Sequence, residues 1–165
     1  MERTGWQQNW VRILTTVLTA AVMVLIFCFS TESAERSDQT SGKISRQVVY
    51  MVYPNYDQKT TEEQQACYEM VQHHVRKTAH FTEYAVLGMM IRFCLASWFG
   101  RRSGLSAAAW ITGTLYSGTD ELHQLLIDGR SGQWTDVLLD SCGVLTGVLI
   151  AGLILLLTWK KRRQA

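Results

Sequence analysis

Two long runs of the chain contain no charged side chain, and they constrain the fold more than any other feature. Residues 13–31 and 141–159 each contain 19 residues without an acid, a lysine or an arginine. A helix rises about 1.5 Å per residue and needs about 20 apolar residues to cross a hydrocarbon core about 30 Å thick. Such runs are rare in soluble helices, so we expect membrane-spanning helices rather than a soluble helical bundle.

The charges of the chain are divided between two kinds of segment. The mean hydropathy of the 165 residues is +0.00, a value that a soluble protein would also have. Five charged residues fall in four apolar windows that make up half of the chain, and the other half carries the remaining 25. The windows are 13–31, 80–99, 107–127 and 137–159. We therefore predict an all-α membrane protein with four transmembrane helices.

Basic residues predict which side of the membrane each loop occupies. Segments 1–12, 100–106 and 160–165 hold eight basic residues and one acid, whereas 32–79 and 128–136 hold seven basic and nine acidic residues. Because loops rich in lysine and arginine stay in the cytoplasm, we expect both termini inside. The chain then divides into a cytoplasmic N-terminus (1–12), a first helix (13–31), an external segment (32–79), three further helices (80–159) and a basic cytoplasmic tail (160–165).

The first window and the external segment leave alternatives open. Basic residues precede the window and small residues follow it, which also fits a signal peptide cleaved near Ala34. The apolar part of a signal peptide is usually about 7–15 residues long, so the length favours a retained helix. Thr60 and Glu63 have the spacing of a capping box, so a helix could begin there and continue into the second window, although the same residues would equally suit a plain loop. The apolar run 48–53 is a candidate for contact with the membrane surface.

Ionisable residues in the windows gather at the predicted outer end. A charged side chain in a bilayer is costly, so such residues usually face protein or water and mark a functional site. The polar residues near the outer ends of the last three windows are His80, Glu83, Asp120, Glu121, Gln124, Asp136 and Asp140. Only Arg92 lies toward the inner half, where its long side chain can extend to the interface. We predict a polar pocket at the outer end of these three helices.

Helical spacing places many of these residues on faces that also carry small residues. The two stripes are Gly113, Ser117, Asp120 and Gln124 in the third window, and Asp136, Asp140, Gly143 and Gly147 in the fourth. Small residues let helices approach closely, and Gly143-x-x-x-Gly147 has the spacing of a common packing motif. The sequence therefore predicts a tight bundle of the last three helices with carboxylates inside it.

The mouth of the predicted pocket favours recognition of an anion. Lys77, His80 and Arg130 flank it, and Arg130 lies in a Gly-Arg-Ser-Gly loop able to present backbone N–H groups. Because the pocket opens at headgroup level, a phospholipid or a lipid-linked cell-wall precursor is the expected ligand. The carboxylates would order the cations. Alternatively, they would act as acid and base in a membrane hydrolase or transferase, or would only hold the helices together.

Other chemistries have less support in the sequence. The four cysteines and four histidines lack metal-ligand spacing, so we expect neither a metal nor another cofactor. Ser117 lacks the surroundings of a nucleophile elbow. His123 lies off the stripe of Asp120 and is as well suited to meeting headgroups as to a function in the pocket. A net charge of +2 without a basic segment interleaved with aromatic residues gives little support to nucleic-acid binding.

The polar residues form two ordered signatures that resemble the VanZ-like family. The first is Lys77-Thr-Ala-His80-Phe-Thr-Glu83-Tyr84-Ala-Val-Leu87-Gly88, and the second joins Asp120-Glu121 and Gln124 to Gly129-Arg130, Asp136, Asp140, Gly143 and Gly147. The similarity extends over about residues 20–158. It implies a multi-pass protein of the bacterial cell membrane. The founding member is associated with resistance to teicoplanin-type glycopeptides, so the resemblance implies a link to glycopeptide susceptibility but supplies no reaction.

Overall fold

The described residues of the chain form five α-helices, which confirms the all-α prediction. The computed structural model describes every residue except 1–4, 33, 101, 103, 128–132 and 165, and the described part contains no strand. The helices are α1 (Gly5–Ser30), α2 (Ala34–Val52), α3 (Thr61–Phe99), α4 (Leu105–Gln124) and α5 (Trp134–Gln164), with a 3-10 turn, η1 (Tyr56–Gln58), between α2 and α3. Each of the four apolar windows is therefore helical over most of its length.

The central helix α3 is longer than a bilayer requires. Its 39 residues correspond to about 58 Å, almost twice the thickness of a hydrocarbon core. It begins with the predicted capping box: the amide of Glu63 donates to Thr60 Oγ1 (3.3 Å), and the amide of Thr60 donates to Glu63 Oε2 (2.9 Å). The segment thus forms the helix, rather than the loop, and continues through the second window. Gly100 ends the helix with a φ of +72°, a conformation that favours glycine.

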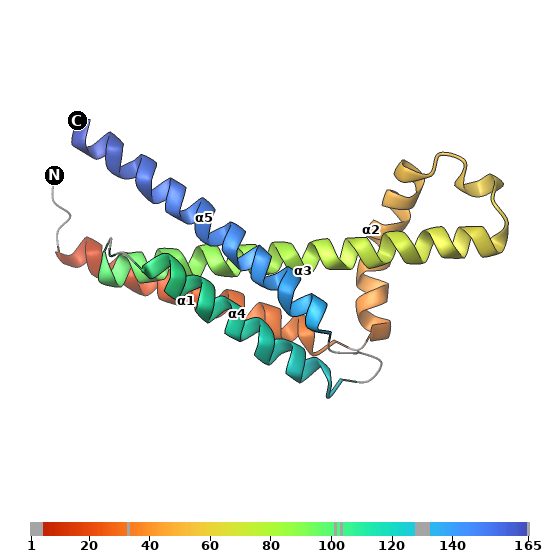
Figure 1. Cartoon of the computed structure of the whole chain (residues 1–165), viewed down its shortest axis with the longest axis horizontal. Coiled ribbons are helices and arrows are strands. Elements are labelled where there is room, and N and C mark those ends of the chain that lie inside the picture. Colours follow the sequence, from red (N-terminus) through yellow and green to blue (C-terminus); the bar gives the residue numbers. More distant parts are fainter. Residues whose placement is uncertain (1–4, 33, 101, 103, 128–132, 165) are drawn as a thin grey trace.

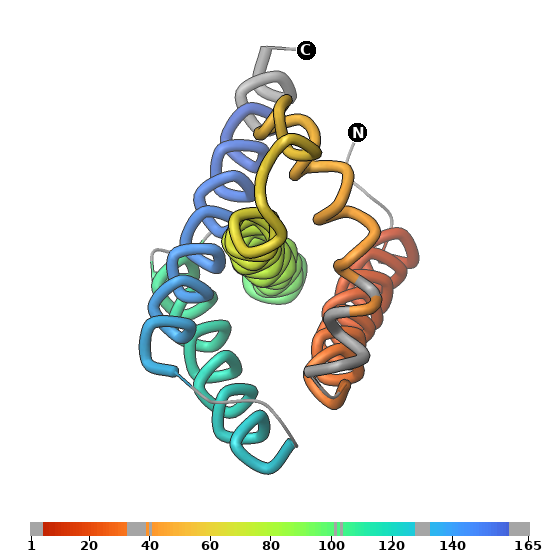
Figure 2. Tube along the Cα trace, turned by 90° about the vertical axis from the view of Figure 1, so that its right-hand side faces the viewer, coloured from red at the N-terminus to blue at the C-terminus, as the bar shows by residue number. Residues whose placement is uncertain are grey.

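Helices α1, α4 and α5 are arranged around the C-terminal half of α3 (Figure 1). Helices α1 and α4 run in one direction and α3 and α5 in the other, so the start of α1 and the end of α5 lie at the same end of the bundle (Figure 1). Viewed along α3, α1 lies on one side and α4 and α5 on the other (Figure 2). Helix α2 crosses the N-terminal half of α3 beyond the opposite end of the bundle (Figure 1).

The closest packing is between α3 and α5. A Cβ added at Gly147 would lie 1.8 Å from the carbonyl oxygen of Ala85, and one at Gly143 would lie 2.5 Å from that of Phe81. On the facing helix, a Cβ at Gly88 would lie 2.3 Å from the carbonyl oxygen of Val144. These separations leave no room for a side chain, so the two backbones are in direct contact. The carboxylates at the start of α5 are thereby fixed relative to α3.

Two of the helices are long and apolar enough to cross a membrane. They are α1 and the part of α5 from Trp134 to Thr158. This conclusion rests on length and composition, and a core helix of a soluble protein or an N-terminal signal meets the same test. Helices α3 and α4, whose windows contain charged residues, do not meet it. Two helices, rather than the four that the sequence analysis predicts, thus meet this test of length and composition.

The side chain of Arg92 lies against the start of α4, next to the segment 100–106 that the sequence analysis assigns to the cytoplasmic side. It is buried, with 8% of its surface exposed, and its Nε donates a hydrogen bond to Ser106 Oγ at 3.1 Å. Ser106 lies in the first turn of α4, which begins after Gly104. The guanidinium therefore ties α3 to the start of α4, and a partner within the protein has replaced solvent.

Candidate functional site

The polar stripe of α4 faces the interior of the bundle. Gly113, Ser117, Asp120 and Gln124 are all buried, as is the neighbouring Glu121. The spacing of these residues over three turns explains why one face of the helix buries them together. Within the stripe, the Gln124 amide donates to Asp120 Oδ2 at 3.4 Å. This helix thus contributes two carboxylates to the interior.

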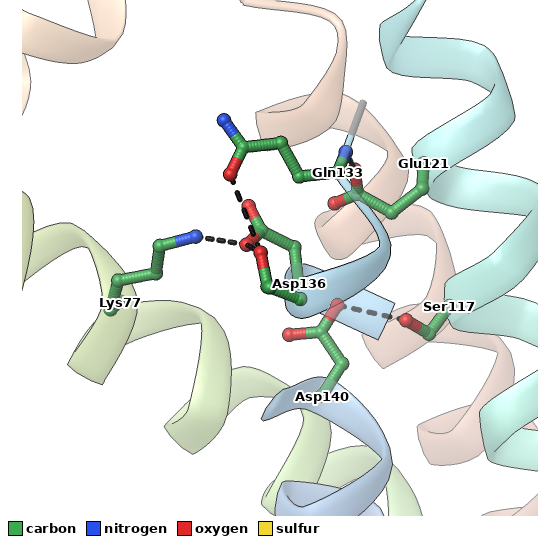
Figure 3. Close-up of polar contacts among 7 residues, drawn as sticks. Lys77, Ser117, Glu121, Gln133, Asp136 and Asp140 are labelled. Carbon is green, nitrogen blue, oxygen red and sulfur yellow. Dashed lines mark hydrogen bonds and ion pairs between the residues drawn. The ribbon is translucent and has the colours of Figure 1, made fainter. Parts of the chain in front are cut away.

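A buried hydrogen bond joins this stripe to α5. Ser117 Oγ donates to Asp140 Oδ2 at 2.8 Å, and neither side chain exposes more than 1% of its surface (Figure 3). The bond occupies the only proton of the Ser117 hydroxyl. Both side chains are buried, so the hydroxyl is not accessible to a substrate in this arrangement. The pair instead holds α4 against α5.

Three buried oxygen atoms around this pair make no hydrogen bond with the described residues. They are Tyr84 Oη, Asp120 Oδ1 and Asp140 Oδ1. Both carboxylates lie close enough to the Tyr84 hydroxyl to interact with it electrostatically, although the geometry of a hydrogen bond is not met. Buried polar atoms are nearly always paired, and an unpaired one costs about 1–3 kcal/mol. The Tyr84 hydroxyl is thus placed to pair with Asp120 inside the bundle.

A second set of polar contacts lies at the end of the bundle from which α5 starts. Lys77 of α3 forms an ion pair with Asp136 in the first turn of α5 (Figure 3). Glu121 of α4 accepts a hydrogen bond from the backbone amide of Gln133 through Oε2 at 3.0 Å. Three helices thus meet at this end through charged side chains.

The remaining candidates lie around this cluster or outside it. His80 and Glu83 are half-buried on α3, and each has an interaction partner. The ring of His123 stacks on Phe27 of α1 with a centroid distance of 4.8 Å. Arg130, which the sequence places at the mouth of the pocket, falls outside the described residues. The structure therefore places Lys77 beside the carboxylates of α4 and α5. His123 instead lies against α1.

Two apolar grooves run along the bundle, each with one carboxylate. A groove of about 520 Å³ between α4 and α5 is lined by Leu115, Leu122, Trp134, Val137 and, at its polar part, Glu121 and Gln133. Another of about 440 Å³ between α1 and α3 is lined by Val22, Leu25, Phe29, Thr82, Glu83 and Val86. A mostly apolar groove with a few polar groups is typical of a binding site for an amphipathic small molecule. The first groove is continuous with the cluster through Glu121.

A model of one protein family matches most of the chain. A family model described as VanZ/LLP1 matches residues 15–156, which include every charged residue of the cluster. The chain belongs to the VanZ/LLP1 family. The comparisons with curated proteins and with solved structures found no match. The family is thus shown by the sequence model alone, and the geometry of the cluster is what this structure adds.

The charge of the cluster in this VanZ/LLP1 chain is mainly negative. Four carboxylates, those of Asp120, Glu121, Asp136 and Asp140, interact electrostatically with one another and are accompanied by the ammonium of Lys77. Among the described residues, no group of three or more histidine, cysteine or acidic side chains is arranged to hold a metal ion. A ligand's polar groups can therefore meet both a cation and hydrogen-bond acceptors at this end.

Two features of this VanZ/LLP1 site escaped the sequence analysis. Tyr84 lies in the first signature and on the face of His80, but the pattern gave its hydroxyl no role. Its complete burial among carboxylates depends on how α3 and α4 meet. No residue type in the sequence marks the backbone amide of Gln133, because every residue except proline has a backbone N–H. Only the position of Gln133 just before α5 could have indicated a backbone donor there.

Proposed function

We propose that this VanZ/LLP1 protein spans the bacterial cell membrane four times and binds an anionic lipid headgroup in the outer leaflet. The headgroup belongs to an envelope phospholipid or a lipid-linked cell-wall precursor. The observation that carries the proposal is the meeting of Lys77, Glu121 and Asp136, from three different helices, at the end of an apolar groove. Such a combination suits a molecule with one charged end and one hydrocarbon chain.

The topology is supported by the arrangement of the helices. The four helices that contain the apolar windows alternate in direction, and α1 begins at the end of the bundle where α5 finishes (Figure 1). Large apolar side chains are exposed on the flanks of α1, α4 and α5, for example Val17, Leu122 and Leu153. An aqueous surface rarely exposes so much contiguous apolar area, whereas a lipid-facing surface requires it. The basic residues of segments 1–12, 100–106 and 160–165 favour a cytoplasmic location for both termini.

The contacts of Lys77 explain how an anion would be held. Its ion pair with Asp136 fixes the ammonium at the end of the bundle, although both side chains remain about one-fifth exposed. A lysine already held in place loses little conformational freedom when a phosphate binds, and a charge-assisted hydrogen bond to phosphate is stronger than a neutral one. The groove beside Glu121 would take the hydrocarbon chain. Arg130 would supply a second cation at the mouth.

The proposal is tested by lipid binding to purified protein in nanodiscs. We expect Lys77→Gln to weaken binding of polyprenyl phosphate or phosphatidylglycerol by about tenfold, equivalent to about 1.4 kcal/mol. Lys59→Gln is the matched control, because Lys59 follows η1 and lies over the ring of Tyr53, away from the cluster. Native mass spectrometry would measure the retained lipid. Equal affinity in a folded Lys77→Gln variant would exclude the proposal.

The same contacts favour a second, purely structural function. Lys77–Asp136 joins α3 to α5, and Ser117–Asp140 joins α4 to α5. If the cluster only holds the helices together, Lys77→Gln lowers the melting temperature and leaves lipid affinity unchanged. A catalytic version of the site would instead turn over prenyl or glycerolipid phosphates, which a phosphate-release assay detects. Because glycopeptides bind cell-wall precursors outside the membrane, a precursor-binding protein would also alter a cell's susceptibility to them.

A further inference from the structure

Helix α2 lies across the end of the bundle where α4 finishes and α5 starts. Figure 1 shows it transverse to α3, just beyond the start of α5, and Figure 2 shows that it continues from the end of α1. One side of α2 packs on α3 through Gly42, Ser45 and Val49, all of which are buried. A Cβ at Gly42 would lie 3.0 Å from the Tyr68 hydroxyl, so the contact is close. If α3 crosses the membrane, α2 runs parallel to the membrane surface.

A second side of α2 is apolar and has no cover within the described part of the chain. Ile44, Met51 and Val52 expose 56%, 80% and 55% of their surfaces, and Val48 between them is half-buried. Ile44, Val48 and Met51 follow one another at intervals of four and three residues, and Val52 lies four residues after Val48, so the four positions share one helical face. We refer to the residues Ile44, Val48, Met51 and Val52 as the α2 stripe. An exposed stripe of this kind indicates an apolar partner.

The contacts of Tyr50 show which way the α2 stripe faces. The Tyr50 hydroxyl donates to Asp57 Oδ1 at 3.2 Å, and its ring packs edge-on against Tyr56 at 5.3 Å. Both partners belong to η1, in the connection that leads away from the bundle toward the start of α3 (Figure 1). At 3.6 residues per turn, the α2 stripe lies roughly opposite Tyr50, with the α3-facing side between them. The stripe therefore faces the end of the bundle.

The polar side of α2 faces away from the bundle. Gln39, Lys43, Arg46 and Gln47 are all exposed and surround Tyr50 on the helical wheel. Helices with an apolar face toward lipid and basic residues on the polar face typically lie in the membrane interface. The connection to α1 is short, because α1 ends at Ser30 and α2 begins at Ala34. Helix α2 therefore starts at the level where α1 would leave the membrane.

From this orientation we propose that α2 is an interfacial helix whose α2 stripe is inserted into the outer leaflet, at the boundary between headgroups and acyl chains. The occupant of the stripe is lipid, and Lys43 and Arg46 interact with anionic headgroups beside it. The inference rests on the proposed membrane topology. Helix α2 also packs closely on α3 near Tyr68. It would therefore hold the segment of α3 that leads to Lys77 at the level of the headgroups.

Site-directed spin labelling of the full chain in phosphatidylglycerol-containing liposomes tests this inference. The four native cysteines are replaced by alanine, and single cysteines are introduced by Ile44→Cys and Met51→Cys. Gln47→Cys is the control on the polar side of α2, and Val17→Cys, on the exposed flank of α1, is the reference for a lipid-facing residue. The measurement is the ratio of oxygen to nickel-chelate accessibility, which is high in lipid. We expect ratios at positions 44 and 51 to approach that at 17 and to exceed that at 47 severalfold.

The outcomes separate this inference from the proposed function. A water-like ratio at 44 and 51 together with a lipid-like ratio at 17 overturns the interfacial helix and leaves the spanning topology intact. A water-like ratio at 17 as well overturns both. Immobilised labels at 44 and 51 that neither reagent reaches would show that protein, such as a second copy of the chain, covers the stripe, and would also overturn the inference. Circular dichroism of each variant checks that it is folded.

Discussion

Helices α1 and α5 are similarly apolar, but they contact α3 in different ways. Helix α5 meets it through backbone contact at Gly143 and Gly147, where an added Cβ would overlap the facing carbonyl groups. Helix α1 meets it through side chains: Ile26 joins the apolar core formed by Tyr84 and Leu87 of α3. At the other end of the bundle, Arg12 Nε donates to the Ser97 carbonyl at 3.2 Å, and Trp98 Nε1 donates to Thr16 Oγ1 at 3.0 Å. Backbone contact defines the α5 interface, whereas apolar side chains and a few hydrogen bonds form the α1 interface.

This difference shows in the burial of the two helices. In α1, only Ile26 and Ser30 are buried, and most of its large apolar side chains are exposed. In α5, the buried residues run from Asp140 through Val144 and Val148 to Ala151. Composition alone would assign both helices the same environment. The comparison shows that the polar cluster includes residues of the helix held by backbone contact, whereas most of the large apolar side chains of α1 are exposed, as the proposed lipid-facing position requires.

The largest effect should come from filling the contact between α5 and α3. We expect Gly147→Leu to lower the free energy of unfolding by about 3 kcal/mol or more, because the new side chain meets backbone that cannot move aside. Gly152→Leu is the control, since nothing lies within 4 Å of a Cβ at that position on the same helix. Thermal unfolding in nanodiscs measures both variants. Equal melting temperatures would show that α5 is not fixed by shape.

Sequence predicted the α5 interface better than the α1 interface for a physical reason. Gly143 and Gly147 repeat at helical spacing, so a single segment reveals the face that they form. The hydrogen bonds between α1 and α3 join residues about 80 positions apart, such as Thr15 and Ser97, and no local pattern indicates which hydroxyls meet. Serine and threonine in apolar helices also bond to their own backbone, as Thr19 does to Thr15.

The site shows the same limit. Spacing within each helix indicated which carboxylates face inward, and the capping box indicated where α3 begins. Contacts between helices were harder to predict. The carboxylates were expected to order Lys77, but the sequence did not indicate that Asp136 would be the one that pairs with it. Arg92 was expected to extend to the interface, and nothing within α3 indicated that its guanidinium would bond Ser106 at the start of α4. Both contacts depend on how one helix is rotated against another, which the spacing within a single helix does not reveal.

A second, smaller effect compares two serines at the interface of α4 and α5. Ser117 donates to the carboxylate of Asp140 at 2.8 Å, whereas Ser141 bonds to neutral groups, the Trp110 indole at 3.0 Å and the Thr114 hydroxyl at 2.9 Å. Hydrogen bonds to a charged group contribute about 1.5–3 kcal/mol and neutral ones about 0.5–1.5 kcal/mol. We therefore expect Ser117→Ala to destabilise the protein about twice as much as Ser141→Ala, measured by thermal unfolding.

The double variant Ser117→Ala with Asp140→Leu provides the control for that comparison. Removing the Asp140 carboxylate together with its donor avoids the unpaired charge that Ser117→Ala alone would leave. We therefore expect the double variant to regain part of the stability lost in Ser117→Ala. If Ser117→Ala is no more destabilising than Ser141→Ala, the carboxylate of Asp140 does not carry the charge that this argument requires. The α5 interface would then be held by glycine contacts alone.

The smallest effect should come from the α1 interface. Trp98→Phe removes the indole N–H bound to Thr16 while keeping an aromatic ring under the Arg12 guanidinium, which lies 5.3 Å from its centroid. We expect a loss of about 0.5–1 kcal/mol, because Trp98 is half exposed and the bond is neutral.

Trp110→Phe removes a similar indole bond between α4 and α5 and serves as the control. The two variants should lose a similar amount of stability, but in different helices. Hydrogen exchange should accelerate in α1 for Trp98→Phe and stay unchanged there for Trp110→Phe. Faster exchange in α5 for Trp98→Phe would contradict the separation of the two interfaces, because it would show that loosening α1 also loosens the helix that carries the cluster.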